Sequence, residues 1–259
     1  METAPTVEGR RPAALLTGLA AAGLIACALV PRVPQDPAYH RFADARRLCG
    51  VPHGNDVLSN APFVVVGICG LAVLRRRPTA ARRGPERAAW TTAFVGVALT
   101  GFGSAYYHWR PTNETLAWDR LPMTVAFAGL VAAQLAERLG PRVGRIALPA
   151  LLVFFPGTVA YWAWTEARGA GDLRWYGYAQ FFPLLFVPVL WATTPRRYDW
   201  TTDLVAAAGW YAAAKVFEAL DRPIYDALGA FLSGHTLKHV AAALATACFV
   251  RHVARRTSV

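Results

Sequence analysis

The sequence has little charge and few cysteines. Only 17% of its 259 residues are charged, whereas a soluble domain usually carries about a quarter. The cysteines show no CxxC spacing, which argues against a disulfide framework and a thiolate metal site; they are Cys27, Cys49, Cys69 and Cys248. Hydrophobic residues make up 55% of the chain and come in long blocks rather than in alternation. Such blocks indicate membrane-spanning helices rather than a membrane barrel.

Acidic residues are also scarce. The chain has 16 of them against 27 basic residues, for a net charge of +11. A basic excess of this size is typical of nucleic-acid binding. Here, however, the arginines form short clusters between apolar blocks, which is the pattern of cytoplasmic loops in membrane proteins. We therefore expect a membrane protein with no nucleic-acid partner.

The apolar blocks are long enough to cross a bilayer, which takes about 20 residues. Eight segments qualify, at roughly 13–30, 57–74, 88–107, 121–137, 146–165, 175–193, 202–220 and 230–250. The first follows Arg10 and Arg11, and a cleaved signal peptide is the alternative interpretation for it. The sequence thus predicts an all-α membrane protein. A seven-transmembrane-helix bundle occupies 34–259, and one additional N-terminal transmembrane helix lies within 1–33.

Arginines concentrate in every second loop. The rich loops and the tail hold Arg75, Arg76, Arg77, Arg82, Arg83, Arg87, Arg138, Arg142, Arg145, Arg196, Arg197, Arg251, Arg255 and Arg256. The intervening loops have fewer arginines or balance them with acids, except for 31–56, where arginine exceeds acid. Because positive loops stay on the cytoplasmic side, we expect both termini in the cytoplasm.

Five polar residues stand at the ends of three predicted spans. Ser104 and His108 are four apart in GFGSAYYHW, and Asp119 follows eleven residues after His108 in WDRLPM. His235 and His239 are also four apart, in SGHTLKHV. A spacing of four places two side chains on one helix face, and two such histidines can hold one divalent metal. The predicted topology places all five residues at the same depth, near the outer face of the membrane. We therefore expect one metal site there.

The other polar residues have plainer interpretations. We expect the remaining histidines to be ordinary polar residues rather than ligands; they are His40, His53 and His252. Lys238 points away from His239 and is expected to reach the membrane interface. Lys215 and Glu218, three apart in AKVFEALD, can neutralise one another on one helix face. A structural ion pair is favoured over a catalytic role for them.

Four motifs in order resemble one known family. DVLSN with Asn60, then GFGSAYYH, WDRLPM and HTLKH are similar to the alkaline ceramidase (alkaline phytoceramidase) family. That family belongs to a superfamily of seven-helix membrane hydrolases that also contains the progestin and adipoQ receptors. The resemblance spans roughly 36–250 and implies a seven-helix bundle holding catalytic zinc. It implies that His108, His235 and His239 bind Zn²⁺, that Asp119 contacts the zinc-bound water, and that Ser104 lies beside it.

The chemistry of these residues fits a hydrolase. Three neutral imidazoles leave the fourth zinc position open for a water nucleophile. Asp119 can act as general base and then acid, and Ser104 can stabilise the developing oxyanion. We therefore expect a zinc-dependent amidase that acts on a ceramide-like membrane lipid entering sideways from the bilayer. The alternatives are a receptor or sensor with a structural metal, another lipid hydrolase, and a transporter, which would place broken helices at mid-membrane.

The family also raises the question of calcium. Its eukaryotic members carry a calcium site in an acidic cluster before their first core helix. The corresponding stretch of this sequence offers Asp36, Asp44, Asn55 and Asp56 without a closely spaced run of acids. Calcium requires six to eight oxygen ligands. A Ca²⁺ site is therefore the less favoured alternative.

Overall fold

The computed structural model describes residues 7–76, 84–196, 198–199 and 201–256. Within these ranges the chain is all-helical, and an isolated bridge between Leu48 and Val51 is its only β pairing. Arg77, Arg82, Arg83 and Arg197 lie outside the described residues. The elements are α1 (Val7–Leu29), η1 (Pro37–His40), α2 (Gly54–Leu58), α3 (Ala61–Arg76), α4 (Pro85–Trp109), α5 (Asn113–Leu139), α6 (Pro141–Glu166), α7 (Arg174–Thr193), α8 (Thr201–Ala219), α9 (Asp221–Ala227) and α10 (Gly234–Arg255).

Each predicted span corresponds to one long helix except 57–74, which is divided between the end of α2 and α3. Five of these segments are long and apolar enough to cross a membrane: Pro12–Leu29, Gly54–Arg76, Pro85–Trp109, Asn113–Leu139 and Pro141–Glu166. The remaining long helices, α7, α8 and α10, have 20, 19 and 22 residues. They are of spanning length, but they carry polar residues such as Gln180, Glu218 and Lys238 on faces that line an internal cavity. The molecule is thus a helical membrane protein.

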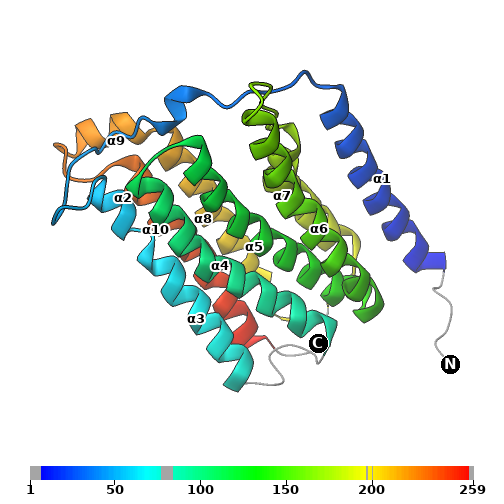
Figure 1. Ribbon diagram of the computed structural model, residues 1–259. Helices are drawn as coiled ribbons and strands as arrows, with labels where there is room; N and C mark the ends of the chain where they lie inside the picture. Colours follow the sequence, from blue (N-terminus) through cyan, green and yellow to red (C-terminus); the bar gives the residue numbers. More distant parts are fainter. Residues whose placement is uncertain (1–6, 77–83, 197, 200, 257–259) are drawn as a thin grey trace.

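The helices form a bundle with two distinct ends (Figure 1). One end carries α2, α9 and the connection between α1 and α2, residues 30–53, which we call the strap. We call this end the α9 end. At the opposite end α1 begins and α10 ends, so we call it the termini end. Helix α1 stands at the side of the bundle, where it packs mainly on α7. Along most of its length one face of α1 is exposed, as expected for an added peripheral helix.

The contact between α4 and α5 is the most extensive in the bundle. Glycine makes it close: at Gly103 a Cβ atom would collide with the backbone carbonyl of Trp118. At Gly96 a Cβ atom would collide with the backbone of Ala126 in the same way. Gly103 precedes Ser104 and Trp118 precedes Asp119, so this tight crossing brings two of the predicted site residues together.

Candidate metal centre

Three histidines meet at the α9 end of the bundle. His108 lies in the last turn of α4, while His235 and His239 occupy successive turns at the start of α10. One ligand atom from each lies within 4.8 Å of the other two. The side chains are buried, with exposures of 1%, 4% and 2% in chain order. The prediction that these three residues come together is confirmed.

The ring nitrogens of the three histidines lie close to one another, and Nε2 of His235 also lies 3.4 Å from Nζ of Lys238. Nε2 of His108 lies 3.3 Å from Nε2 of His235, and Nε2 of His239 has no hydrogen-bond partner. A buried polar atom without a partner costs roughly 1–3 kcal/mol. A divalent metal ion would satisfy all three nitrogens at once, because neutral imidazole is the commonest metal ligand. The residues present therefore fit a metal ion, and three imidazoles suit zinc among other transition metals.

The orientation of His239 is set by Ser59. The Ser59 hydroxyl donates to the backbone carbonyl of Asp56 at 3.0 Å. Its oxygen lies 2.7 Å from Nδ1 of His239 and must accept there, so Nδ1 carries the proton. The lone pair of Nε2 is then left facing the other two histidines. Partners of this kind fix the tautomer of metal ligands. The sequence reasoning missed Ser59, whose only signal was its position beside Asn60.

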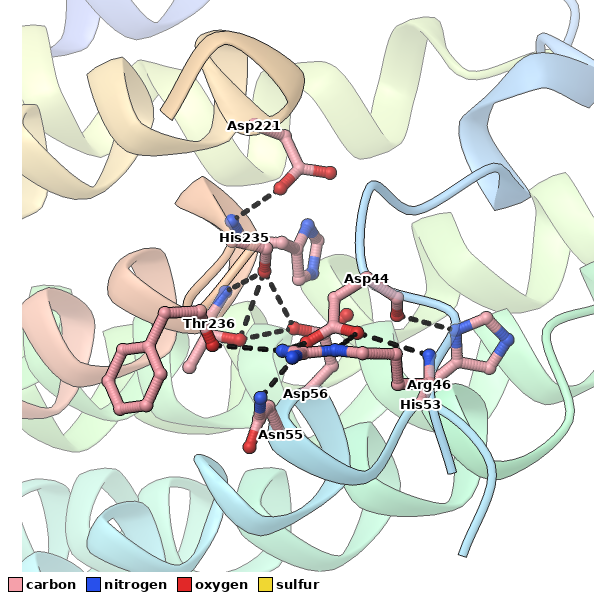
Figure 2. Close-up of polar contacts among 10 residues, drawn as sticks. Asp44, Arg46, His53, Asn55, Asp56, Asp221, His235 and Thr236 are labelled. Atoms are coloured by element: carbon pink, nitrogen blue, oxygen red, sulfur yellow. Dashed lines mark hydrogen bonds and ion pairs between the residues drawn. The ribbon is translucent and has the colours of Figure 1, made fainter. Parts of the chain in front are cut away.

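The start of α10 is anchored by two aspartates (Figure 2). Asp221 accepts a hydrogen bond from the backbone N–H of His235 at 2.8 Å. Asp56 accepts one from the Thr236 hydroxyl at 2.7 Å and one from the Ser233 hydroxyl at 3.1 Å. Ser233 also caps the helix by accepting from the Thr236 N–H. These bonds fix the first turn of α10, and with it His235.

The strap covers the histidines from outside. The Phe42 ring packs against the rings of His108 and His235, with centroid distances of 4.6 Å and 4.7 Å. The adjacent Ala43 N–H donates to Asp221 at 2.9 Å, which ties the strap to α9. Phe42 is itself buried. The strap therefore shields this face of the cluster from water.

Ser104 and Asp119 lie beside the cluster. Their side chains lie close to each other and are 3% and 8% exposed. Both line the same cavity as His239. Ser104 stands one helical turn before His108, as the spacing predicted. A proton acceptor and a hydroxyl thus adjoin the histidines, while the functional roles of the two residues stay predictions.

A narrow cavity of about 200 Å³ extends from these polar groups into the bundle. It lies between α5, α7, α8 and α10, and its walls are mainly apolar, including Met123, Phe127, Leu130, Leu184 and Val187. Its lining on α5 runs from Asp119 to Gln134, a distance of about 22 Å at 1.5 Å per residue. One leaflet of hydrocarbon is about 15 Å thick, so the cavity has the length of a long acyl chain.

The ion pair on α8 has a third member. Lys215 contacts Glu218, as predicted, and Nζ of Lys238 lies 2.8 Å from the same carboxylate. The prediction that Lys238 reaches the membrane interface is wrong. Its side chain is only 18% exposed and lies 3.4 Å from Nε2 of His235. The close packing of α8 on α10 supplies Glu218 as a counter-charge, which makes an inward-facing lysine tolerable.

The four residues considered for calcium do not gather into one site. The guanidinium of Arg46 holds both oxygens of Asp44, at 2.8 and 2.7 Å, and Asn55 donates to Asp44 at 2.9 Å (Figure 2). Asp36 caps η1, and Asp56 accepts hydrogen bonds from the Ser233 and Thr236 hydroxyls at the start of α10. Burial alone would raise the pKa of Asp44, but hydrogen bonds from Arg46 and Asn55 outweigh it and lower the pKa to about 2. The cation bound to the Asp44 carboxylate is thus the guanidinium of Arg46.

The remaining polar residues have protein partners. His40 lies 2.9 Å from the Tyr107 hydroxyl and 2.9 Å from Oδ1 of Asn113, and His53 bonds to the Asp44 carbonyl at 3.1 Å. Asn60 is fully buried and donates to the Asp56 carbonyl at 2.7 Å without a hydrogen bond to the histidines. Asn60 therefore stabilises the turn that carries Ser59.

The chain was also compared with known proteins. A scan of protein-family models gives no match, and a search of curated proteins gives none. The site geometry and the sequence motifs therefore carry the functional assignment.

Proposed function

We propose that this protein is a zinc-dependent intramembrane amidase that hydrolyses a ceramide-like lipid to a fatty acid and a free amine base. One observation carries the proposal. Three buried histidines bring one ligand atom each within 4.8 Å of the others, and one of them, His239, lines a mainly apolar cavity together with Ser104 and Asp119. The sequence resemblance to the alkaline ceramidases supports the same activity.

The residues of this chain have distinct tasks in the reaction. A zinc ion held by His108, His235 and His239 would activate water and polarise the amide carbonyl. The Asp119 carboxylate accepts a proton from the attacking water and returns it to the departing nitrogen, so that OH adds to the carbonyl carbon and H to the amine. The Ser104 hydroxyl donates a hydrogen bond to the carbonyl oxygen as that oxygen gains charge.

The cavity suits a lipid that arrives from the bilayer. Helices α7 and α8 are consecutive in the chain but barely touch, and the cavity lies between them. An acyl chain passing this gap would lie along the apolar walls and bring its amide group to the histidines. Hydrophobic burial of the chain provides binding energy of about 0.8 kcal/mol per methylene.

The proposed topology has eight spans, with α1 added to a core of α3 to α8 and α10. Arg75, Arg76 and Arg87 lie at the termini end, as do Arg251 and Arg255 near the end of α10. By the positive-inside rule this end faces the cytoplasm and the metal centre faces outward. Reporter fusions at Gly140 and at the C-terminus should both read cytoplasmic. An external reading at either position would contradict this topology.

The decisive experiment measures metal content and turnover on the same purified protein. Purified protein should contain about one zinc per chain by elemental analysis and release fatty acid from a lipid amide. Removal of zinc by a chelator should stop the release, and added zinc should restore it. Zinc binding without hydrolysis across a panel of lipid amides would instead favour a receptor that uses the metal as scaffold.

A further inference from the structure

Both lysines of the chain lie at the metal centre. Of 27 basic residues, only Lys215 and Lys238 are lysine, and all others are arginine. The two ammonium groups share the single carboxylate of Glu218. All three side chains line the cavity together with Asp119 and His239. An ammonium is a compact point charge, and two of them line a cavity whose walls are mainly apolar.

Another cation lies near these lysines, although it does not line the cavity itself. Arg120 adds a third cation: it is 4% exposed, and Nη1 has no hydrogen-bond partner. Its guanidinium packs on the rings of Tyr39 and Tyr176, both of which line the cavity, at 5.5 Å and 4.6 Å. Within the described ranges no carboxylate forms an ion pair with Arg120, whose guanidinium donates instead to the amide oxygen of Gln35 at 2.7 Å.

The Lys215–Glu218–Lys238 cluster thus carries two positive charges and one negative charge. Of the other carboxylates nearby, Asp119 also lines the cavity, and Asp56 and Asp221 accept hydrogen bonds from neutral donors at the start of α10. A divalent metal on the histidines would enlarge the excess. Uncompensated charge inside a membrane bundle is costly and is usually functional. The imbalance is relieved when a ligand brings negative charge to the polar end of the cavity.

We propose that Lys238 and Lys215 form an anion subsite, and that the substrate is a lipid amide whose amine part carries a carboxylate or phosphate. This inference rests on the proposed amidase function and narrows its ceramide-like substrate class to acidic members. The acyl chain occupies the apolar walls, the amide lies at the histidines, and the anion contacts Lys238. Glu218 is a positioning residue that holds both ammonium groups at the cavity.

Three substrates with the same acyl chain test the subsite. N-palmitoylglycine carries a carboxylate, N-palmitoylethanolamine phosphate carries a phosphate, and N-palmitoylethanolamine is neutral. For the wild type, kcat/KM for at least one anionic substrate should exceed that for the neutral one about tenfold or more, as charge-assisted hydrogen bonds allow. The better of the two anions identifies the headgroup. Equal or greater kcat/KM for the neutral amide would overturn the subsite.

Variants assign the preference to the lysines. In Lys238→Met the ratio of anionic to neutral kcat/KM should fall towards one, and Lys238→Arg should retain most of it. Lys215→Met should reduce the ratio less, because Lys215 is farther from the histidines. Lys238→Met combined with Glu218→Gln keeps the net charge of these three side chains at the wild-type value if the single variant folds poorly. Arg251→Met at the termini end is the control and should keep the wild-type ratio. An unchanged ratio in Lys238→Met would also overturn the subsite.

A binding measurement separates the subsite from the chemistry. Ketone analogues, in which a methylene replaces the amide N–H, cannot be hydrolysed. The acidic analogue should bind the wild type about tenfold more tightly than its neutral counterpart, with the difference lost in Lys238→Met. This result without hydrolysis of any amide would uphold the subsite and refute the amidase. Hydrolysis together with equal binding of the two analogues would uphold the amidase and refute the subsite.

Discussion

The two ends of the bundle both bury polar side chains, but they pair them differently. At the termini end, Arg256 contacts Glu86 at 2.5 Å and Glu137 at 3.2 Å. Tyr198 donates to Glu86 at 3.2 Å, and His252 lies 3.8 Å from Glu137. At the α9 end, three imidazoles instead face one another, and Nε2 of His239 has no partner.

The difference separates a structural network from a ligand site. Charges of opposite sign that meet in the interior offset much of the cost of their burial. Neutral imidazoles that point their ring nitrogens at a common centre do not offset that cost for one another. Evenly paired groups stabilise a fold, whereas converging nitrogen lone pairs without a hydrogen-bond donor indicate a missing ligand. We therefore interpret the termini end as a structural network and the α9 end as a candidate metal site.

The largest effect should come from removing a ligand at the α9 end. His235→Ala and His239→Ala should each lose the metal and reduce amide hydrolysis to background, because two imidazoles hold zinc poorly. His53→Asn is the matched control, since His53 has a φ of +48° that Asn tolerates. Elemental analysis and product release measure both properties. Full zinc occupancy in either alanine variant would contradict the ligand assignment.

Asp119→Asn should separate metal binding from turnover. The amide has the size of the acid but cannot accept a proton, so we expect retained zinc and a loss of roughly 10²–10⁴ in kcat. Ser104→Ala should also retain zinc and lose about 10²–10³ if it stabilises the oxyanion. Near-normal hydrolysis by zinc-loaded Asp119→Asn would defeat the mechanism while leaving the metal site intact.

A substitution at the termini end should lower stability and leave metal binding and turnover unchanged. Arg256→Met removes the shared partner of Glu86 and Glu137, which should lower the free energy of unfolding by about 3–5 kcal/mol. Zinc content and kcat of the folded fraction should stay at the wild-type values. Thermal unfolding in detergent, read beside metal content, measures the contrast. Loss of zinc in folded Arg256→Met would mean that the two ends are coupled.

The smallest effect concerns the strap. Because the pKa of Asp44 is lowered to about 2, its ion pair with Arg46 stabilises the fold fully above the unfolded pKa of about 3.9. That contribution declines as the pH falls through about 2. Asp44→Asn should thus lower the melting temperature slightly at pH 6, and the difference from wild type should shrink towards pH 2. A calcium chelator should leave both melting temperatures unchanged. A wild-type melting temperature that falls when the chelator is added would support the calcium alternative.

Much of the fold and the metal cluster could be predicted because the deciding signals are local. A block of about 20 apolar residues must become a helix in hydrocarbon, where every backbone hydrogen bond has to be made within the segment. Spacings of four between Ser104 and His108, and between His235 and His239, place each pair on one helix face. Alternation of the spans then brings the ends of α4, α5 and α10 to one level, and the structure confirms that the three histidines meet there.

Other features depend on partners that are far apart in the chain. In the sequence, Arg138 and Arg256 have the position of cytoplasmic loop residues. Both are nevertheless buried, because the helices of the bundle enclose them at the termini end. Lys238 was predicted to reach the interface, since nothing nearby in the sequence shows that α8 presents Glu218 to it. Arg46 is only two residues from Asp44, but the strap must first fold back on α2 and the loop after α9 to hold them together.

The sequence by itself determined the helical membrane architecture and the identity of the three histidines, because hydrophobic length and helical spacing act within single segments. Only the tertiary structure decided the tautomer of His239, because Ser59, which accepts from its Nδ1–H, lies 180 residues away in the chain. It alone paired Arg256 with Glu86 across 170 residues, and it alone gathered both lysines on one carboxylate. Hydrogen bonds and ion pairs act over about 3–4 Å, so their partners are set by the packing of whole helices.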